Sequence, residues 1–285
     1  MMMLNFTRKE YHKAICTELI SYQDGPGVTS STDKTPTMSG ELARRMISRL
    51  NCATGRRRLS PDTIRHHFTR LTKTFISQSL SALGRPIVGE WAVFTTGLHM
   101  AVDASGRQAT VGDVQGVLTA YPRLRTELNR YCLITPDIIV ARRVRHDDLK
   151  RLGWDFLREA RKVQPTSASH KAVGYECPLY AVISCNWTIR GSPDEHASVE
   201  VLNLCRNGSG STPHTMAVTF EPLPNRLASM AFATSDLDCL YHVALWELLE
   251  AIDEVGGSDH KEMVQALVQG RRLRDISDLP LDLAI

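Results

Sequence analysis

Residues 182–190 read VISCNWTIR, and this short stretch predicts a β-strand. Apolar and polar side chains alternate along it with the two-residue period of a strand. One face would be apolar and would carry Ala181, Ile183, Cys185, Trp187 and Ile189. The opposite face, after Val182, would carry a polar row formed by Ser184, Asn186, Thr188 and Arg190. A strand that buries one face and lines up polar groups on the other is expected to present them to a polar partner.

Predicted strands and helices alternate along the rest of the chain. Further strands are expected at residues 88–96, 135–144 and 215–222, and helices at 4–21, 40–50, 61–83, 111–131, 192–208 and 235–257. Ser60, Pro61 and Gly84 supply start and stop signals for the third of these helices. The pattern predicts an α/β fold in which helices flank a central mixed sheet. We expect one domain over residues 1–285, mainly helical over 1–85 and with a catalytic core over 86–285.

Composition narrows the class of protein only moderately. The 285 residues are 42% hydrophobic and carry a net charge of +3, which permits a polyanionic partner without requiring one. The seven cysteines are scattered and form no C-x-x-C pair, so we expect reduced thiols rather than a disulfide framework or a zinc site. With no apolar leader and no long apolar run, the chain is expected to be soluble and cytoplasmic, with no membrane partner.

Two acidic residues are candidates for chemistry. Asp137 follows a proline at the start of a predicted strand, where a carboxylate is either a turn or cap residue or a metal ligand. Glu200 lies on a predicted helix and, taken alone, is a solvated carboxylate. Two acids near a polar strand face suit metal-dependent phosphodiester hydrolysis, because carboxylates hold Mg²⁺ and the metal activates water and polarises the phosphate. Their spacing alone is weak support.

Most arginine clusters are expected to lie on solvated faces. Arg190 differs because it ends the polar row, where a guanidinium can bind the acceptor edge of guanine in a major groove. His66, His67 and His196 have no second ligand at helical spacing, so no metal role is assigned to them.

Several blocks of the chain resemble those of one known family. They are ITPDIIV (134–140), ISCNWTIR (183–190), LNLCRN (202–207), EPLPNR (221–226), LDCLYHVALWEL (237–248) and GRRLRDISDLPLDLAI (270–285). These blocks resemble NgoMIV-type restriction endonucleases. The resemblance implies the PD-(D/E)xK fold and a type II enzyme of a restriction-modification system. It also implies Mg²⁺ as cofactor, double-stranded DNA with a GC-rich palindrome as substrate, and a homotetramer.

The resemblance also implies roles for individual residues. Asp137 and Glu200 match the metal-binding acids of the family, and Ser184 matches a serine of the catalytic motif. Cys185 matches a position whose main-chain carbonyl completes the metal shell. Asn186 occupies the catalytic position at which the family has a lysine.

Other positions extend the comparison to DNA recognition. Arg190 and Arg226 match arginines that read guanines. Ser192 and Pro193 stand where the family has an acid and an arginine, so part of the recognition loop is missing. Thr69 stands where the family has a further glutamate.

These departures leave alternatives open, because asparagine carries no charge with which to stabilise the transition state. The chain is either an active endonuclease in which another basic group, such as Arg142 or Arg143, supplies the charge, or a catalytically impaired homologue that binds DNA without cutting it. An α/β enzyme of another class is the third reading.

Overall fold

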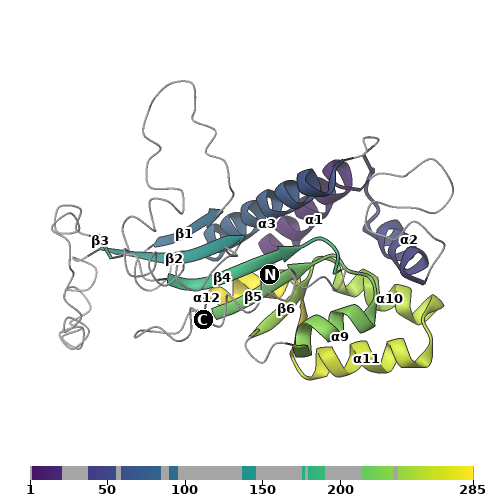
Figure 1. Ribbon diagram of the computed structural model, residues 1–285. Coiled ribbons are helices and arrows are strands. Elements are labelled where there is room, and N and C mark those ends of the chain that lie inside the picture. The colour runs from purple at the N-terminus through teal and green to yellow at the C-terminus, as the bar shows by residue number, and fades with distance from the viewer. Residues whose placement is uncertain are drawn as a thin grey trace.

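A mixed β-sheet forms the centre of the protein (Figure 1). The computed structural model describes residues 2–20, 38–55, 59–84, 90–95, 137–145, 175–176, 179–189, 214–233 and 237–284. Its strands are β1 (Glu90–Thr95), β2 (Ile138–Arg145), β3 (Tyr175–Glu176), β4 (Leu179–Asn186), β5 (His214–Thr219), β6 (Cys239–His242) and β7 (Leu273–Asp275). They are ordered β1-β2-β4-β5-β6-β7, with β3 paired to β2. The pairs β1–β2, β2–β3 and β2–β4 are antiparallel, whereas β4 to β7 run parallel.

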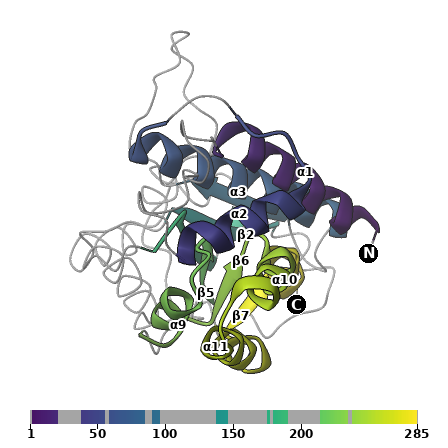
Figure 2. The ribbon, with the colours of Figure 1, turned by 90° about the vertical axis from the view of Figure 1, so that its right-hand side faces the viewer.

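Helices cover the sheet on both sides. They are α1 (Met2–Glu18), α2 (Met38–Leu50), α3 (Pro61–Leu83), α9 (Pro224–Ala233), α10 (Leu245–Val255), α11 (Ser258–Gln269) and α12 (Leu279–Ala284), with a 3₁₀ turn, η2 (Ile276–Asp278). In Figure 1, α1 and α3 lie above the sheet and α9 and α11 below it. Figure 2 shows α2 beside α10 at the parallel side of the sheet. The predicted α/β class, a central mixed sheet flanked by helices, is confirmed.

Helix α3 has the limits that its end signals predict. The Ser60 hydroxyl accepts a hydrogen bond from the Thr63 N–H at 3.2 Å, Pro61 occupies the first turn, and Gly84 ends the helix at φ 94°. The apolar side chains that recur at helical spacing are buried, namely Ile64, Phe68, Leu71, Phe75 and Ile76. The 111–131 and 192–208 helices of the sequence analysis lie outside the described residues.

The opening strand differs from its prediction in one respect. It begins earlier, at Leu179, and ends at Asn186, so Trp187 follows the strand. Because β4 lies between β2 and β5 with helices on both sides, both of its faces are buried, and Ser184 is only 1% exposed. The expectation that the polar row faces a partner along its length is therefore wrong. Of the described members of this row, Ser184 is buried, whereas Asn186 and Thr188, near the end of the strand, are half-buried.

The single helix predicted at 235–257 is two elements. Residues Cys239–His242 form β6, which pairs in parallel with β5 and β7, and the helix begins only at Leu245. A short apolar run fits a buried strand as well as a helix, and pairing with two neighbouring strands decides in favour of the strand.

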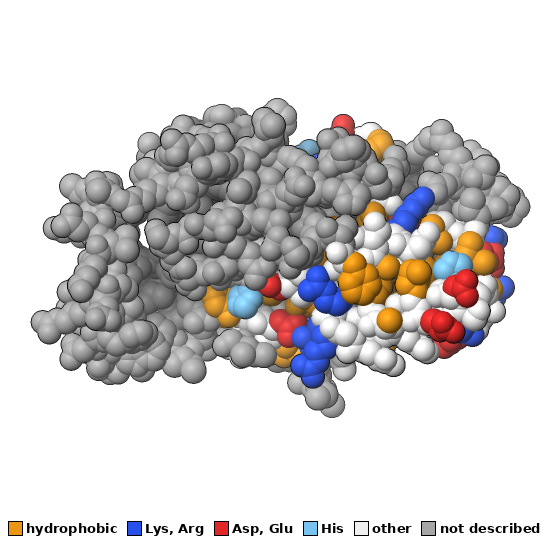
Figure 3. Space-filling model, turned by 60° about the horizontal axis from the view of Figure 1, so that its bottom comes forward, with side chains coloured by type: hydrophobic (Ala, Val, Ile, Leu, Met, Phe, Trp, Pro, Cys, Tyr) orange, Lys and Arg blue, Asp and Glu red, His pale blue; other side chains and the backbone are white. Residues whose placement is uncertain are grey.

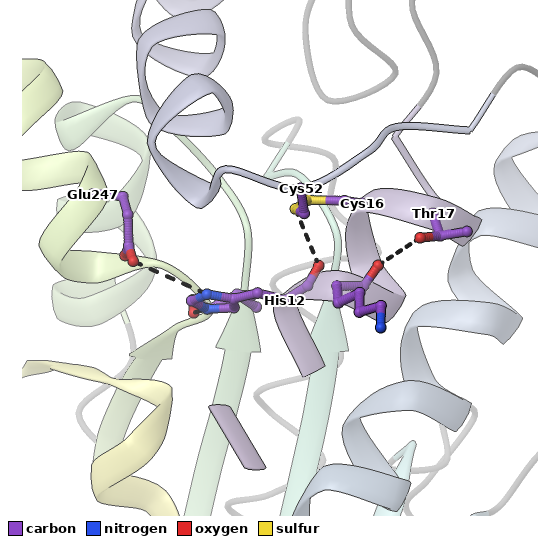
Figure 4. Close-up of a disulfide and its surroundings, with 7 residues drawn as sticks. His12, Cys16, Thr17, Cys52 and Glu247 are labelled. Carbon is purple, nitrogen blue, oxygen red and sulfur yellow. Dashed lines mark hydrogen bonds and ion pairs between the residues drawn. A yellow bond between two sulfur atoms is a disulfide. The ribbon is translucent and has the colours of Figure 1, made fainter. Parts of the chain in front are cut away.

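A disulfide joins Cys16 at the end of α1 to Cys52 just after α2, with the two Cα atoms 6.2 Å apart (Figure 4). The Gly55 N–H donates to the carbonyl oxygens of Cys16 (3.1 Å) and Ile20 (2.8 Å), which holds this segment against α1. The expectation of reduced thiols is therefore wrong for this pair, because packing of α1 against the segment after α2 brings together residues far apart in sequence. Cys185 and Cys239 are free thiols.

Arg8 on α1 connects the two ends of the chain. Its guanidinium donates to both carboxylate oxygens of Asp275 (2.9 and 2.8 Å) and of Glu247 (2.8 and 2.7 Å). Asp275 is fully buried and also accepts hydrogen bonds from the Leu245 N–H and the Ser277 N–H. Burial opposes ionisation of Asp275, but the hydrogen bonds from Arg8 outweigh it and lower the pKa of this carboxyl group.

His242 at the end of β6 is also fully buried. Its Nε2 lies 3.1 Å from the carbonyl oxygen of Glu221, and its Nδ1 accepts a hydrogen bond from the Ala244 N–H at 3.0 Å. Nε2 therefore carries the proton of a neutral imidazole.

None of the helices in the described ranges combines the length and apolarity that crossing a bilayer requires.

We predict that Arg8→Met lowers the free energy of unfolding by about 3–5 kcal/mol, because the change leaves two paired carboxylates without their cation. Urea unfolding measures the loss. The matched control is Arg44→Met, because Arg44 pairs with Glu41 within α2 and is 40% exposed. The control is expected to change stability by about 0.5 kcal/mol or less. Equal effects in the two variants would contradict the role of Arg8.

We also predict that the protein loses stability as the pH falls from neutral. Burial lowers the pKa of His242 to about 4, whereas in the unfolded chain it is about 6.5. The unfolded state therefore binds more protons between these values, so the stabilisation is complete above about pH 6.5 and is lost progressively towards pH 4. The difference corresponds to about 3 kcal/mol.

Urea unfolding at a series of pH values, comparing His242→Gln with the wild type, tests this origin. The variant should show a shallower loss of unfolding free energy in this pH range, although it is less stable at neutral pH. His214→Gln serves as the control, because the His214 side chain is 49% exposed. Parallel pH profiles for the wild type and His242→Gln would contradict the assignment.

Candidate active site

The antiparallel pairing of β2 with β4 brings Asp137 beside Cys185. Ile138 pairs with Ile183, so the residue before β2 lies next to the residues that follow Ile183. One carboxylate oxygen of Asp137 accepts the Cys185 N–H at 2.8 Å. The Asp137 side chain is only 12% exposed. Burial raises the pKa of Asp137, while the Arg65 guanidinium and the Cys185 N–H favour its ionised form.

Arg65, on the second turn of α3, forms an ion pair with the other oxygen of Asp137. The guanidinium nitrogen lies 3.2 Å from that oxygen. The Arg65 side chain is 57% exposed, in contrast to the nearly buried carboxylate beneath it. Arg65 cannot be recognised from the sequence, because a helix surface carries many exposed arginines and only the packing of α3 on the sheet identifies this one.

Ser184 and Asn186 lie on the same side of β4 as each other. The Asn186 side-chain N–H donates to the Ser184 hydroxyl oxygen at 3.2 Å, and Asn186 pairs with Thr219 across the parallel strand. Asn186 therefore contributes a neutral amide at the end of the strand, hydrogen-bonded within its own row.

Thr69 packs against the strand rather than facing solvent. Its side chain is 8% exposed, and both Thr69 and Thr72 lie beside the buried Cys185 thiol. The Thr72 hydroxyl is also within 2.7 Å of the Tyr11 hydroxyl. Burial raises the pKa of the Cys185 thiol well above its usual value, so this cysteine is a neutral core group. Thr69 therefore packs α3 against β4, and its side chain carries no charge.

Aromatic rings anchor the chain where β4 ends. Trp187 stacks on Phe220 with ring centroids 4.7 Å apart and meets the edge of Phe68 at 5.3 Å. The Phe220 N–H donates to the Trp187 carbonyl oxygen at 3.2 Å. These contacts join α3 to the residues that follow β4 and β5, and so fix the path of the chain toward Thr188 and Ile189.

Glu221 organises the segment beyond these rings. It is fully buried, and its carboxylate accepts the N–H of Ile189 at 2.8 Å and of Leu223 at 3.1 Å. Arg226 at the start of α9 lies 3.6 Å from the same carboxylate. Burial raises the pKa of Glu221, whereas these N–H groups and Arg226 lower it. The sequence analysis missed Glu221, although an acid directly after a strongly apolar strand is a signal for such a buried anchor.

The structure thus brings together four of the predicted site residues, which are Asp137, Ser184, Cys185 and Asn186. Arg226 is held by Glu221 and not by any of these four. Glu200, Arg190 and Ser192 lie outside the described residues. Within the described ranges, no group of three His, Cys, Asp or Glu side chains lies close enough to hold a metal ion.

Comparison with known proteins identifies the family. The family model described as NgoMIV restriction enzyme matches residues 11–285. The type II restriction enzyme NgoMIV of Neisseria gonorrhoeae is 34% identical over 282 residues, which cover 98% of this chain and 97% of that protein.

A solved complex of the restriction endonuclease PspGI with its substrate DNA aligns with 36% of this chain and 38% of its own. The alignment has 18% identity and a TM-score of 0.24, which is too low to support an argument. The family model and the NgoMIV relative, in contrast, span almost the entire chain. The chain therefore belongs to the NgoMIV restriction enzyme family and is, by that membership, a type II restriction endonuclease.

Proposed function

We propose that this endonuclease hydrolyses DNA phosphodiester bonds with Mg²⁺, at the end of β4 and the start of β2. The observation that carries the proposal is the Asp137 carboxylate, which is nearly buried and oriented by the Cys185 N–H. A carboxylate in this environment keeps a fixed orientation at the sheet edge. That is the requirement for a metal ligand of the PD-(D/E)xK type.

The available donors fit Mg²⁺ in their chemistry. Carboxylate and carbonyl oxygens are hard ligands that this ion prefers. Asp137 and Glu200 would hold it through their carboxylates, and the main-chain carbonyl of Cys185 would complete the set. When bound, Mg²⁺ polarises the phosphate and lowers the pKa of an attacking water.

Two further residues would complete the site at the end of β4. The half-buried Asn186 offers a neutral amide, and the buried Ser184 hydroxyl accepts a hydrogen bond that orients this amide. Arg190 and Arg226 would bind guanines in the major groove of a GC-rich palindrome, and Ser192 would contact DNA next to Arg190. Glu221 supports this role, because it binds both the Ile189 N–H, one residue before Arg190, and the Arg226 guanidinium.

We also propose that residues 1–285 form one domain and that the protein acts on double-stranded DNA as a homotetramer. Exposed hydrophobic side chains support the assembly into a homotetramer. They include Phe6 (65%), Phe232 (61%) and Trp246 (52%). Figure 3 shows hydrophobic side chains gathered between basic ones on the face toward α9 and α11. An apolar patch such as the one in Figure 3 is typical of subunit contacts.

A second candidate is a homologue that binds DNA without cutting it. The neutral Asn186 favours this candidate, because loss of one electrostatic contact to the transition state lowers the rate by about 10²–10³-fold. Cleavage of diverse plasmid substrates with Mg²⁺ or Mn²⁺ decides between the two. Absence of cutting, together with binding that is insensitive to Mg²⁺, would identify the second function.

Under the first function, we predict that Asp137→Asn lowers the cleavage rate by at least about 10²-fold, because an amide holds Mg²⁺ far less strongly than a carboxylate. Single-turnover cleavage and calorimetric titration with Mg²⁺ measure the two effects. Asp62→Asn is the control, because Asp62 is exposed on the first turn of α3. Wild-type cleavage by Asp137→Asn would exclude the proposed site.

We further predict that Arg190→Ala combined with Arg226→Ala weakens DNA binding, by about 1–3 kcal/mol for each lost bidentate contact. Fluorescence anisotropy with the cognate duplex measures the affinity. Glu221→Gln should reproduce part of the Arg226 effect, since it removes the charge that orients this guanidinium. Arg271→Ala, at an exposed position in the turn after α11, is the control. Unchanged affinity in the double variant would show that DNA lies elsewhere.

A further inference from the structure

The ion pair between Arg65 and Asp137 points to a residue that the family comparison does not assign. Among the described residues, Arg65 is the cation within ion-pair distance of Asp137, at 3.2 Å. It approaches the carboxylate oxygen opposite to the one that the Cys185 N–H holds. A positive charge therefore lies directly over the proposed metal ligand, supplied by α3 and not by the sheet.

Geometry disfavours the arginines considered first as sources of this charge. Arg142 and Arg143 lie along β2 and pair with Trp91 and Glu90 of β1. At about 3.3 Å per strand residue they are roughly 16–20 Å from Asp137. The backbone at these two positions is therefore well removed from the end of β2 that lies next to Asp137.

The exposure of Arg65 allows it to bind a second anion. More than half of its side chain is exposed, at 57%, while Asp137 is 12% exposed. A guanidinium has five N–H donors, and one contact to Asp137 leaves donors for a phosphate oxygen approaching from solvent. Thr69 follows Arg65 at i+4 on the same helix face and is packed against Cys185, so the backbone that carries Arg65 is fixed.

We propose that Arg65 contacts the phosphate undergoing hydrolysis and supplies the positive charge that Asn186 lacks, in addition to neutralising Asp137 when DNA is absent. The inference rests on the proposed function. Asn186 and Thr69 are both neutral. The charged groups described at this end of the site are therefore the Asp137 carboxylate and the Arg65 guanidinium, which are in contact. The positive charge on α3 balances the negative charge at the sheet edge.

In the reaction, a water oxygen forms a new bond to phosphorus and the bond from phosphorus to the leaving sugar oxygen breaks. The water loses one proton to solvent and the sugar oxygen gains one, so hydrolysis needs no further reactant. Negative charge accumulates on the non-bridging phosphate oxygens in the transition state. Arg65 would stabilise it by a charge-assisted hydrogen bond.

Single-turnover cleavage by Arg65→Ala of a plasmid substrate that the wild type cuts tests the catalytic part. We expect the rate to fall by about 10²–10³-fold, with partial activity in Arg65→Lys, because lysine keeps the charge but not the planar fork. Adding Asn186→Lys to Arg65→Ala should restore cleavage by returning a cation to the phosphate. Arg70→Ala is the matched control, because Arg70 is 54% exposed on the same helix and pairs with Glu18.

DNA binding at several salt concentrations, with Ca²⁺ replacing Mg²⁺, tests the phosphate contact without relying on catalysis. An arginine that binds a phosphate contributes about one unit to the slope of log affinity against log salt. Arg65→Ala should therefore lower the slope by about one relative to the wild type. An arginine that only neutralises Asp137 leaves the slope unchanged, and thermal unfolding of each variant verifies that it is folded.

The outcomes separate the two proposals. If the wild type cuts and Arg65→Ala cuts at the same rate, the role of Arg65 is overturned while the proposed endonuclease function stands. If the wild type cuts no substrate, cleavage is excluded as the function and the salt slope decides on Arg65. The role of Arg65 in hydrolysis is then overturned; a reduced slope supports only its contact with a DNA phosphate, and an unchanged slope overturns that contact as well.

Discussion

The hydrogen bonding of β4 to β2 on one side and to β5 on the other is the constraint on which the rest of the site depends. The antiparallel pairing brings the Asp137 carboxylate to the Cys185 N–H. The parallel pairing brings the chain after β5 beside the chain after β4, so that Phe220 stacks on Trp187 and Glu221 reaches Ile189. A strand with an antiparallel neighbour on one side and a parallel neighbour on the other collects groups from three segments that are distant in sequence.

Three carboxylates with little or no solvent exposure are stabilised in the same way. Each accepts main-chain N–H groups and is paired with one arginine, in the pairs Asp137–Arg65, Glu221–Arg226 and Asp275–Arg8. The arginines differ in exposure, at 57%, 30% and 14% in the same order. Arg8 is the most buried of the three arginines, so no group from solvent can displace its carboxylate partners, and its role is structural. The two more exposed arginines keep surface for a polyanion, and these are the two that we propose to contact DNA.

Local sequence signals predicted the helix whose ends carry capping residues. They failed where contacts between distant segments determine the structure. Ser60 and Gly84 define α3 because capping is a property of neighbouring residues. The run that contains β6 was assigned to a helix, since only its two strand partners distinguish a buried strand from a helix of the same composition. The Cys16–Cys52 pair and the Arg65–Asp137 pair could not be anticipated, because each joins segments that meet only through helix packing. Asp137 is a candidate from its place after a proline at a strand start, and its role as a metal ligand stays a prediction.

The Arg8 contact has a consequence for the synthesis of the protein. Arg8 and Asp275 are 267 residues apart in sequence, so their contact forms only after synthesis has continued through Asp275. At about 5–20 residues per second, α1 waits roughly 10–50 s on a translating ribosome before its partner is translated. Truncated chains released during that interval lack β7 and with it the Asp275 acceptor of Arg8. Only a chain that extends through Asp275 can complete this core, so shorter nascent fragments would not reach the native state.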